Sequence, residues 1–210
     1  MTAIAARPTT RLARTLSANT PAKATPLDLF ALAKRQWLSG ERVDVGALAT
    51  RLKIGRATAF RWVGSRDLLL GEILWSLCDA MMQNCATQAS GQGAPRIAAI
   101  CEAVVRAILQ FRPFRQFVRQ DPQYALKLLT SKLGPVQGRS ISQVRELLIA
   151  ETLRGLVLPL GVDTLAYLLV RLCESFIYAD VISDQTVDVA DAGLAVELLL
   201  SGRVQRADLS

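Results

Sequence analysis

Residues 44–70 constrain the fold more than any other part of the chain, because apolar side chains recur there at helical spacing on both sides of a short break. The two sets are Val45, Leu48, Ala49 and Leu52, followed by Ala57, Phe60 and Val63. The break, Lys53-Ile54-Gly55, has about the length of a helix-turn-helix corner. The sequence therefore predicts two short helices joined by a tight turn, and a further helix that begins at Ser65.

The second of these predicted helices is basic on one side. Arg56, Thr58 and Arg61 lie on the side expected to face outward, while Ala57, Phe60 and Val63 are expected to turn inward. A small, rigid helix pair with positive charge on one face suits entry into a DNA major groove. The segment therefore predicts contact with double-stranded DNA.

The charge of the chain is concentrated in the same region. Residues 1–70 hold 12 Lys and Arg and 4 Asp and Glu, whereas the remaining 140 residues hold 13 bases and 14 acids. The whole excess of the +7 net charge therefore lies in the first third of the sequence. Binding to phosphates is one reason to concentrate charge in this way, and a solvated basic surface is the alternative.

Residues 27–75 resemble the DNA-binding domain of TetR-type regulators through the stretches LFALAKRQWLSG, VDVGALATRLKIGRATAFRWVGSRDLLL and GEILW. Thr58-Ala59-Phe60 stands where the family usually has Thr-Leu-Tyr, and GSRDLL matches the opening of the family's fourth helix. The resemblance implies that Arg66 holds a DNA phosphate, as a Lys does in the family. The residues predicted to contact DNA are Asp44, Lys53, Arg56, Ala57, Thr58, Phe60, Arg61, Trp62 and Arg66.

The sequence departs from the family pattern at four positions. Lys53 replaces the glycine of the turn, so a positive φ there would cost about 1 kcal/mol. Gly55 replaces the usual Ser N-cap, and Gly46 replaces the first basic residue of the preceding helix. Phe60 replaces a phosphate-binding Tyr, so we expect Arg56 or Arg61 to take over that contact.

The composition predicts an all-α protein that is not an enzyme. The chain is 51% hydrophobic and 6% aromatic over 210 residues, which favours helices and allows a sizeable core. It contains no His, no Gly-rich phosphate loop and no C-x-x-C spacing, so we expect no catalytic residue, metal or cofactor. We interpret the four cysteines as core residues in a reducing cytoplasm: Cys78, Cys85, Cys101 and Cys173. The alternative is a redox sensor.

The pattern of breakers divides the chain into three parts. Residues 1–25 contain no acid and are expected to be a disordered basic arm, residues 26–71 a helix-turn-helix domain, and residues 72–203 a ligand-binding and dimerisation domain. No apolar run approaches the roughly 18–20 residues of a membrane span, and no signal peptide is recognised, so we expect a cytoplasmic protein without membrane contact. The helices expected after Asp67 are 65–89, 95–111, 114–120, 122–131, 138–158, 163–182 and 187–200.

The last two predicted helices are apolar around most of their circumference. Such helices need cover on all sides, which a partner subunit can supply. The resemblance implies a homodimeric four-helix interface formed by residues 163–200, with Leu169 as an inward position. A two-fold dimer could read a palindromic operator with two recognition helices about one DNA turn apart.

The middle of the chain carries a narrower resemblance. FRPFRQFVRQDPQYALKLLTSKLGPVQGRSISQVRELL and DTLAYLLVRLCESFIYADVI are similar to the ligand-sensing half of the QsdR-like subgroup, TetR-type repressors associated with lactone and quorum-signal degradation genes. The implied effector is a lactone or acyl-lactone. The walls of its pocket are predicted to be Trp75, Phe111, Phe114, Phe117, Tyr124 and Leu128, with a polar stripe of Tyr167, Arg171, Glu174 and Tyr178.

Two alternatives to this pocket remain open. The aromatic set could be plain core, and Arg171 and Glu174 could form a structural ion pair at the dimer interface. Two functions also remain open for the whole chain. The first is a ligand-responsive, homodimeric transcriptional repressor released from its operator by a small apolar effector. The second is a helical small-molecule-binding or protein-binding module without sequence-specific DNA recognition.

Overall fold

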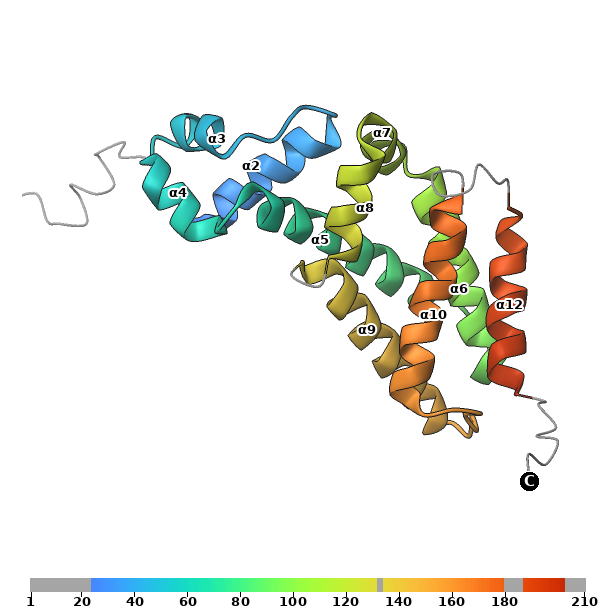
Figure 1. Cartoon of the computed structure of the whole chain (residues 1–210). Coiled ribbons are helices and arrows are strands. Elements are labelled where there is room, and N and C mark those ends of the chain that lie inside the picture. Colours follow the sequence, from blue (N-terminus) through green and yellow to red (C-terminus); the bar gives the residue numbers. More distant parts are fainter. Residues whose placement is uncertain (1–23, 132–133, 180–186, 203–210) are drawn as a thin grey trace, which may run out of the picture.

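The computed structural model describes residues 24–131, 134–179 and 187–202, and the regular elements in these ranges are all α-helices (Figure 1). The expected basic arm therefore lies almost wholly outside the described residues. The helices are α2 (Pro26–Leu38), α3 (Val45–Arg51), α4 (Arg56–Val63), α5 (Arg66–Gln88), α6 (Gly93–Gln110), α7 (Arg112–Gln120), α8 (Pro122–Thr130), α9 (Pro135–Thr152), α10 (Val162–Ile177) and α12 (Val189–Ser201).

Local capping explains where the N-terminal helices begin. Thr25 and Asp28 form a capping box at the start of α2, and Asp44 caps α3 by accepting a hydrogen bond from the Ala47 amide at 2.7 Å. Ser65 caps α5 by accepting from the Leu68 amide at 3.1 Å. The start expected at Ser65 is therefore confirmed.

The helices expected to end before Pro113 and Pro135 do so, since α6 ends at Gln110 and α8 at Thr130, but each proline also lies in the first turn of the next helix. Pro113 lies in the first turn of α7, and Pro135 opens α9, in positions where the missing N–H has no helical partner to lose. As a result α9 begins at 135 instead of 138, and it ends at Thr152 instead of 158 because the chain turns through Gly155 at φ 103°. For α10 the described helix ends at Ile177, and the expected residues 180–182 lie outside the described part.

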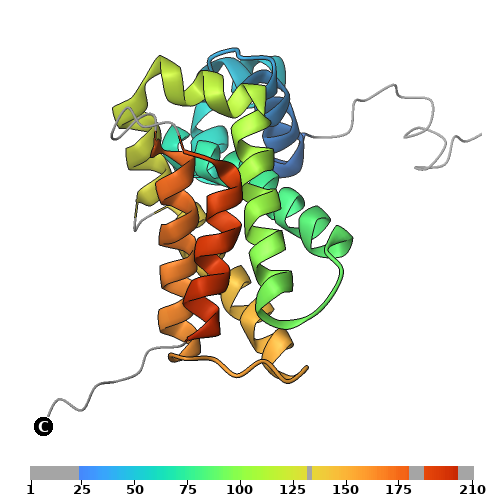
Figure 2. The ribbon, with the colours of Figure 1, turned by 90° about the vertical axis from the view of Figure 1, so that its right-hand side faces the viewer.

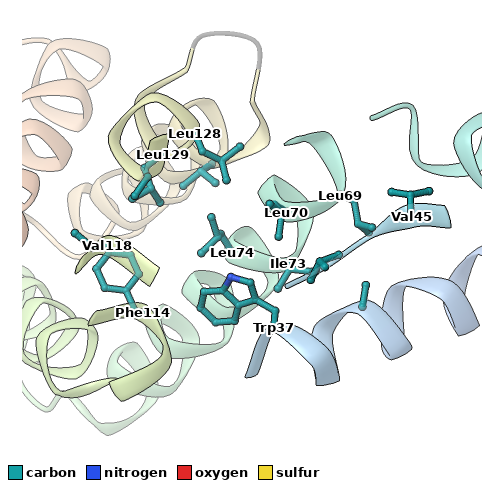
Figure 3. Close-up of a cluster of buried hydrophobic side chains, with 14 of the residues drawn as sticks. Trp37, Val45, Leu69, Leu70, Ile73, Leu74, Phe114, Val118, Leu128 and Leu129 are labelled. Atoms are coloured by element: carbon teal, nitrogen blue, oxygen red, sulfur yellow. The ribbon is translucent and has the colours of Figure 1, made fainter. Parts of the chain in front are cut away.

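The helix-turn-helix and the C-terminal bundle share a core. One cluster of buried side chains extends from α2, α3 and α4 through α5 to α7, α8 and α10. Figure 3 shows Trp37 of α2 beside Ile73 and Leu74 of α5 and close to Phe114 of α7. A second cluster joins α6, α9, α10 and α12. Figure 2 shows α10, α12 and α6 standing side by side in this bundle.

The far end of the bundle is held by a buried carboxylate. The side chain of Glu151 is 0% exposed; it accepts hydrogen bonds from Arg96 at 2.9 Å, Arg154 at 2.9 Å and the Gly93 amide at 2.7 Å. Arg96 also donates to the carbonyl of Ala86 at 2.8 Å. Because each charge is paired, this network joins the ends of α5, α6 and α9 without an orphan charge. No helix among the described residues is long and apolar enough to cross a membrane.

A polar cluster joins the start of α5 to α8. Arg66 donates from Nε to the Val43 carbonyl at 2.8 Å and from Nη1 to the Tyr124 hydroxyl at 3.1 Å, with its guanidinium 5.5 Å from the Tyr124 ring centroid. Tyr124 in turn donates to Asp67 at 2.6 Å. Burial, followed by this hydrogen bond to Asp67, raises the pKa of Tyr124 to about 12. Tyr124 therefore ties the first turn of α5 to α8.

Replacing Tyr124 with Phe should lower the free energy of unfolding by about 1.5–3 kcal/mol, because hydrogen bonds to charged groups contribute that much. The matched control is Tyr167→Phe, which removes an exposed hydroxyl and should change stability by less than about 0.5 kcal/mol. Urea unfolding of both variants measures the difference. Equal midpoints for Tyr124→Phe and the wild type would show that the cluster does not stabilise the fold.

Candidate DNA-binding face and effector cavity

The turn between α3 and α4 is a Schellman motif. The amide of Ile54 donates to the Ala49 carbonyl at 3.0 Å, and the amide of Lys53 donates to the Thr50 carbonyl at 3.1 Å. Lys53 occupies the position usually taken by glycine and has φ 55°. The predicted positive φ at Lys53 is therefore confirmed. Gly55 then caps α4 without a side-chain hydrogen bond.

The inward face of α4 differs from the expected one. Ala59 is fully buried, with Trp62 and Val63 half-buried against the same core, whereas Ala57 and Phe60 are exposed. The prediction that Ala57 and Phe60 turn inward is thus wrong. The small Ala59 side chain sits where α4 packs on the core, and this sets the rotation of the helix.

The outward face of α4 is basic and lies at one extremity of the molecule (Figure 1). Arg56, Ala57, Phe60 and Arg61 are all exposed there, and Phe60 keeps 40% of its surface accessible. Arg61 donates to the Thr58 hydroxyl at 3.4 Å, which leaves most of its guanidinium free to meet a ligand. The structure therefore brings five of the predicted DNA-contacting residues to one helix face or its edge.

Gly46 makes room for Arg56 beside α3. A Cβ at Gly46 would lie 3.1 Å from Arg56 Nε and 3.1 Å from Asp44 Oδ1. The pKa of Asp44 is lowered, first by the hydrogen bond from the Ala47 amide and more weakly by the charges of Arg56 and Arg42. A basic residue at position 46, as the resemblance would expect, would crowd this arrangement.

Trp62 and Arg66 lie away from the exposed face of α4. Trp62 is half-buried, and Arg66 is engaged with Val43 and Tyr124. The phosphate contact of Arg66 stays a prediction, and it would use N–H groups that those two bonds leave over.

A cavity of about 100 Å³ lies in the C-terminal part. Four of the predicted pocket residues line it: Phe111, Phe114, Glu174 and Tyr178. The structure does not bring the other six to its wall: Trp75, Phe117, Tyr124, Leu128, Tyr167 and Arg171.

The remaining wall was missed in the sequence. It comes from α5, α6, α9 and α10, with single residues of α2 and α8, and among its members are Trp37, Leu74, Leu77, Met81, Val104, Ile108 and Ser140. The α5 contribution had a readable signal, because Leu74, Leu77, Cys78 and Met81 share one helical stripe. Trp75 lies about 100° away from Leu74 around α5 and instead stacks under Arg139, 5.9 Å from its guanidinium.

The polar groups of the wall gather on α9, α10 and α5. Arg171 Nη1 lies 2.7 Å from Glu174 Oε2, so the two side chains form an ion pair. The geometry is not that of a hydrogen bond. Burial raises the pKa of Glu174, while the Arg171 charge and a hydrogen bond from Gln137 act in the opposite direction. Burial likewise raises the pKa of Tyr178. The Arg171–Glu174 ion pair left open above therefore exists, with Glu174 on the cavity wall, and its place at a dimer interface stays a prediction.

Three of the four cysteines line the same cavity: Cys78, Cys101 and Cys173. All four are free thiols, and Cys85 and Cys101 are buried, as the core interpretation predicted. Burial raises the pKa of Cys78 to about 11, so its thiol stays protonated at neutral pH. The described residues contain no cluster of three or more His, Cys, Asp or Glu that could hold a metal ion.

The outer side of α12 is unusually apolar, and one large side chain of α10 is exposed as well. Leu194 is 57% exposed and Leu198 67% exposed on α12, and Tyr167 is 51% exposed on α10. Leu169, by contrast, is fully buried in the cluster of α6, α9, α10 and α12. The expectation that Leu169 belongs to an interface between subunits is therefore wrong, because its side chain is already covered within one chain.

The chain is similar to known regulators in sequence and in fold. Residues 92–201 match the family model described as "Tetracyclin repressor-like, C-terminal domain". The transcriptional repressor QsdR of the TetR family from R. erythropolis superimposes with a TM-score of 0.78 at 30% identity, over 84% of this chain and 94% of that one. No curated protein sequence matches the chain.

Two further solved structures are more distant. PfmR, a TetR family transcriptional regulator from Thermus thermophilus, has 19% identity and a TM-score of 0.44 over 84% of this chain and 98% of that one. A putative transcriptional regulator from Pseudomonas aeruginosa has 15% identity and a TM-score of 0.46 over 84% and 86%. The helix-turn-helix, the helical bundle and the matched C-terminal domain lead to one conclusion: the chain belongs to the TetR family of transcriptional regulators, which are not enzymes.

Proposed function

We propose that the protein is a homodimeric repressor that binds a palindromic operator in the cytoplasm and leaves it when a small apolar effector binds. The observation that carries the proposal is the exposed basic face of α4, which ends at Gly64 directly before α5 begins. The same α5 continues into the wall of the cavity through Leu74, Leu77 and Met81. One helix thus touches both the expected DNA reader and the expected effector site.

The dimer is proposed to form through the outer side of α10 and α12. Exposure of large leucines such as Leu194 and Leu198 to water is unfavourable by about 25 cal/mol for each Å² of apolar surface. A second copy of the same surface would cover them in an isologous contact. Two α4 helices could then read the two half-sites of a palindrome.

The effector is proposed to be an uncharged molecule with an apolar body, and a lactone fits this description. The cavity wall contains no Lys or Arg and only one carboxyl group, Glu174, so nothing there would balance the charge of an anionic ligand. The hydroxyls of Ser140 and Tyr178 can donate hydrogen bonds to a lactone carbonyl.

Release of DNA is proposed to follow from the size of the cavity. At about 100 Å³ it is smaller than the roughly 300–1,000 Å³ of typical ligand pockets, so an effector must move the surrounding helices or side chains. Met81 and Met82 can adapt their shape, but Leu74 belongs to the core that holds α2. A coupling of about 1–3 kcal/mol would change DNA affinity 5–150-fold.

Arg61→Ala should weaken binding to the operator more than to a scrambled duplex, because a base-reading Arg contributes about 1–3 kcal/mol of discrimination. The operator is first selected from random duplexes with the wild-type protein, and affinities are then measured by fluorescence anisotropy. Arg145→Ala removes the same charge on α9, far from α4, and serves as the control. Equal losses on both duplexes would assign Arg61 to a phosphate, and a wild type without any sequence preference would favour the binding-module alternative.

Leu198→Glu should convert the dimer to monomer, because an unpaired carboxylate would be buried at the interface at a cost of several kcal/mol. Analytical ultracentrifugation measures the mass, and circular dichroism checks that the helices persist. The control is Leu153→Glu, which places the same charge on another exposed leucine. A wild-type monomer at micromolar concentration that still binds the palindrome tightly would overturn the dimer proposal.

Tyr178→Phe should weaken binding of a lactone effector about 2- to 10-fold, because one hydrogen bond contributes about 0.5–1.5 kcal/mol. Lactones of varied tail length are titrated into the protein–operator complex, and the concentration that releases half of the DNA is compared. Tyr167→Phe on the same helix, whose side chain is exposed, should leave that concentration unchanged. If no lactone releases DNA, the lactone proposal fails while the regulator proposal stands.

A further inference from the structure

The outer face of α7 carries three arginines in a row. Arg112, Arg115 and Arg119 are exposed and follow one another at spacings of three and four residues, so they lie on one side of the helix. The opposite side holds Phe114 and Val118, which are buried. The arginines are therefore not needed to hold α7 in place.

These arginines have no acidic partner among the residues that the structure describes. The other exposed arginines of the bundle in the described residues are paired: Arg106 with Glu102, Arg139 with Glu72, Arg145 with Asp163, Arg154 with Glu151 and Arg171 with Glu174. A surface depression of about 410 Å³ lies over α7 and is lined by Arg112, Arg115, Gln116, Arg119 and Gln120. Its wall contains positive charge and amides but no carboxylate.

The face is continuous with the DNA-binding end. Gln116 and Gln120 also line the adjoining cleft, which contains Arg42 of the loop before α3. Arg42 in turn acts, together with Arg56 of α4, on the carboxylate of Asp44. Figures 1 and 2 both place α7 at the same edge of the molecule as α3.

The cleft between them also contains acids. Glu41 accepts a hydrogen bond from the Ser39 hydroxyl at 3.2 Å, and Asp121 accepts one from the Tyr124 amide at 3.0 Å. Both carboxylates are thus engaged locally, and neither lies in the depression over α7.

We propose that the arginine face of α7 binds the phosphate backbone of the duplex beside the groove that α4 enters. Seven residues of helix place Arg112 and Arg119 about 10 Å apart, which matches about three steps of 3.4 Å, the axial rise between neighbouring phosphates of one strand. Guanidinium groups bind phosphate oxygens in a bidentate manner. The face is a second, sequence-independent DNA contact, and it rests on the proposed function.

The test is the salt dependence of DNA binding by the triple variant Arg112→Gln, Arg115→Gln and Arg119→Gln. Each lost phosphate contact lowers the slope of log K against log salt by about 0.9, so we expect the slope to fall by about 2–3 for each protomer. Affinity for the selected operator and for its scrambled duplex should fall by the same factor, since phosphates carry no sequence information.

The control is the triple variant of Arg106, Arg139 and Arg145 to Gln, which removes the same net charge from paired surface positions. A slope unchanged from the wild type, or changed no more than in this control, would overturn the α7 proposal while operator binding by the wild type keeps the proposed function. Loss on the operator alone would also overturn it, because that is the result for a base contact. A wild type that binds no DNA would overturn both.

Discussion

The burial of α5 between two sets of helices is the interaction on which the rest of the structure depends. Its first half buries Leu69, Leu70, Ile73 and Leu74, and these side chains contact the helix-turn-helix on one side and α8 on the other. The core is therefore not divided at the boundary between the two functional parts. A movement of α5 has to be accommodated by both parts, because close-packed side chains leave few voids to absorb it.

This continuity gives the cavity a direct route to the DNA-binding end. Trp37 lies in the last turn of α2, and Leu74 lies on α5. Both side chains line the cavity. Both belong to the cluster that contains Ala59, the buried anchor of α4. An effector of the proposed kind that displaced either side chain would act on the core beneath α4 itself. The Tyr124 cluster adds a polar connection beside this apolar one.

Local chemistry made the N-terminal motif predictable, whereas tertiary packing decided the rest. The turn at Lys53 and the cap at Ser65 depend on residues within a few positions along the chain, so the sequence predicts them. The rotation of α4 about its axis depends on the packing of Ala59 against the core. A helix of eight residues has too few apolar positions for its sequence to predict that rotation. The cavity wall combines residues of six or more helices, and only their packing shows that Ser140 and Trp37 meet there.

Lys53 gives the helix-turn-helix an unusual balance between folding and binding. Its left-handed backbone conformation costs about 1 kcal/mol, which glycine would not incur. The unbound protein is therefore less stable than it would be with glycine at position 53. The exposed ammonium group can recover that energy only when an anion stands next to it. In the proposed complex with DNA, a phosphate beside Lys53 would offset a strain that stays uncompensated in the unbound protein, and a glycine at this position would then exchange affinity for thermal stability.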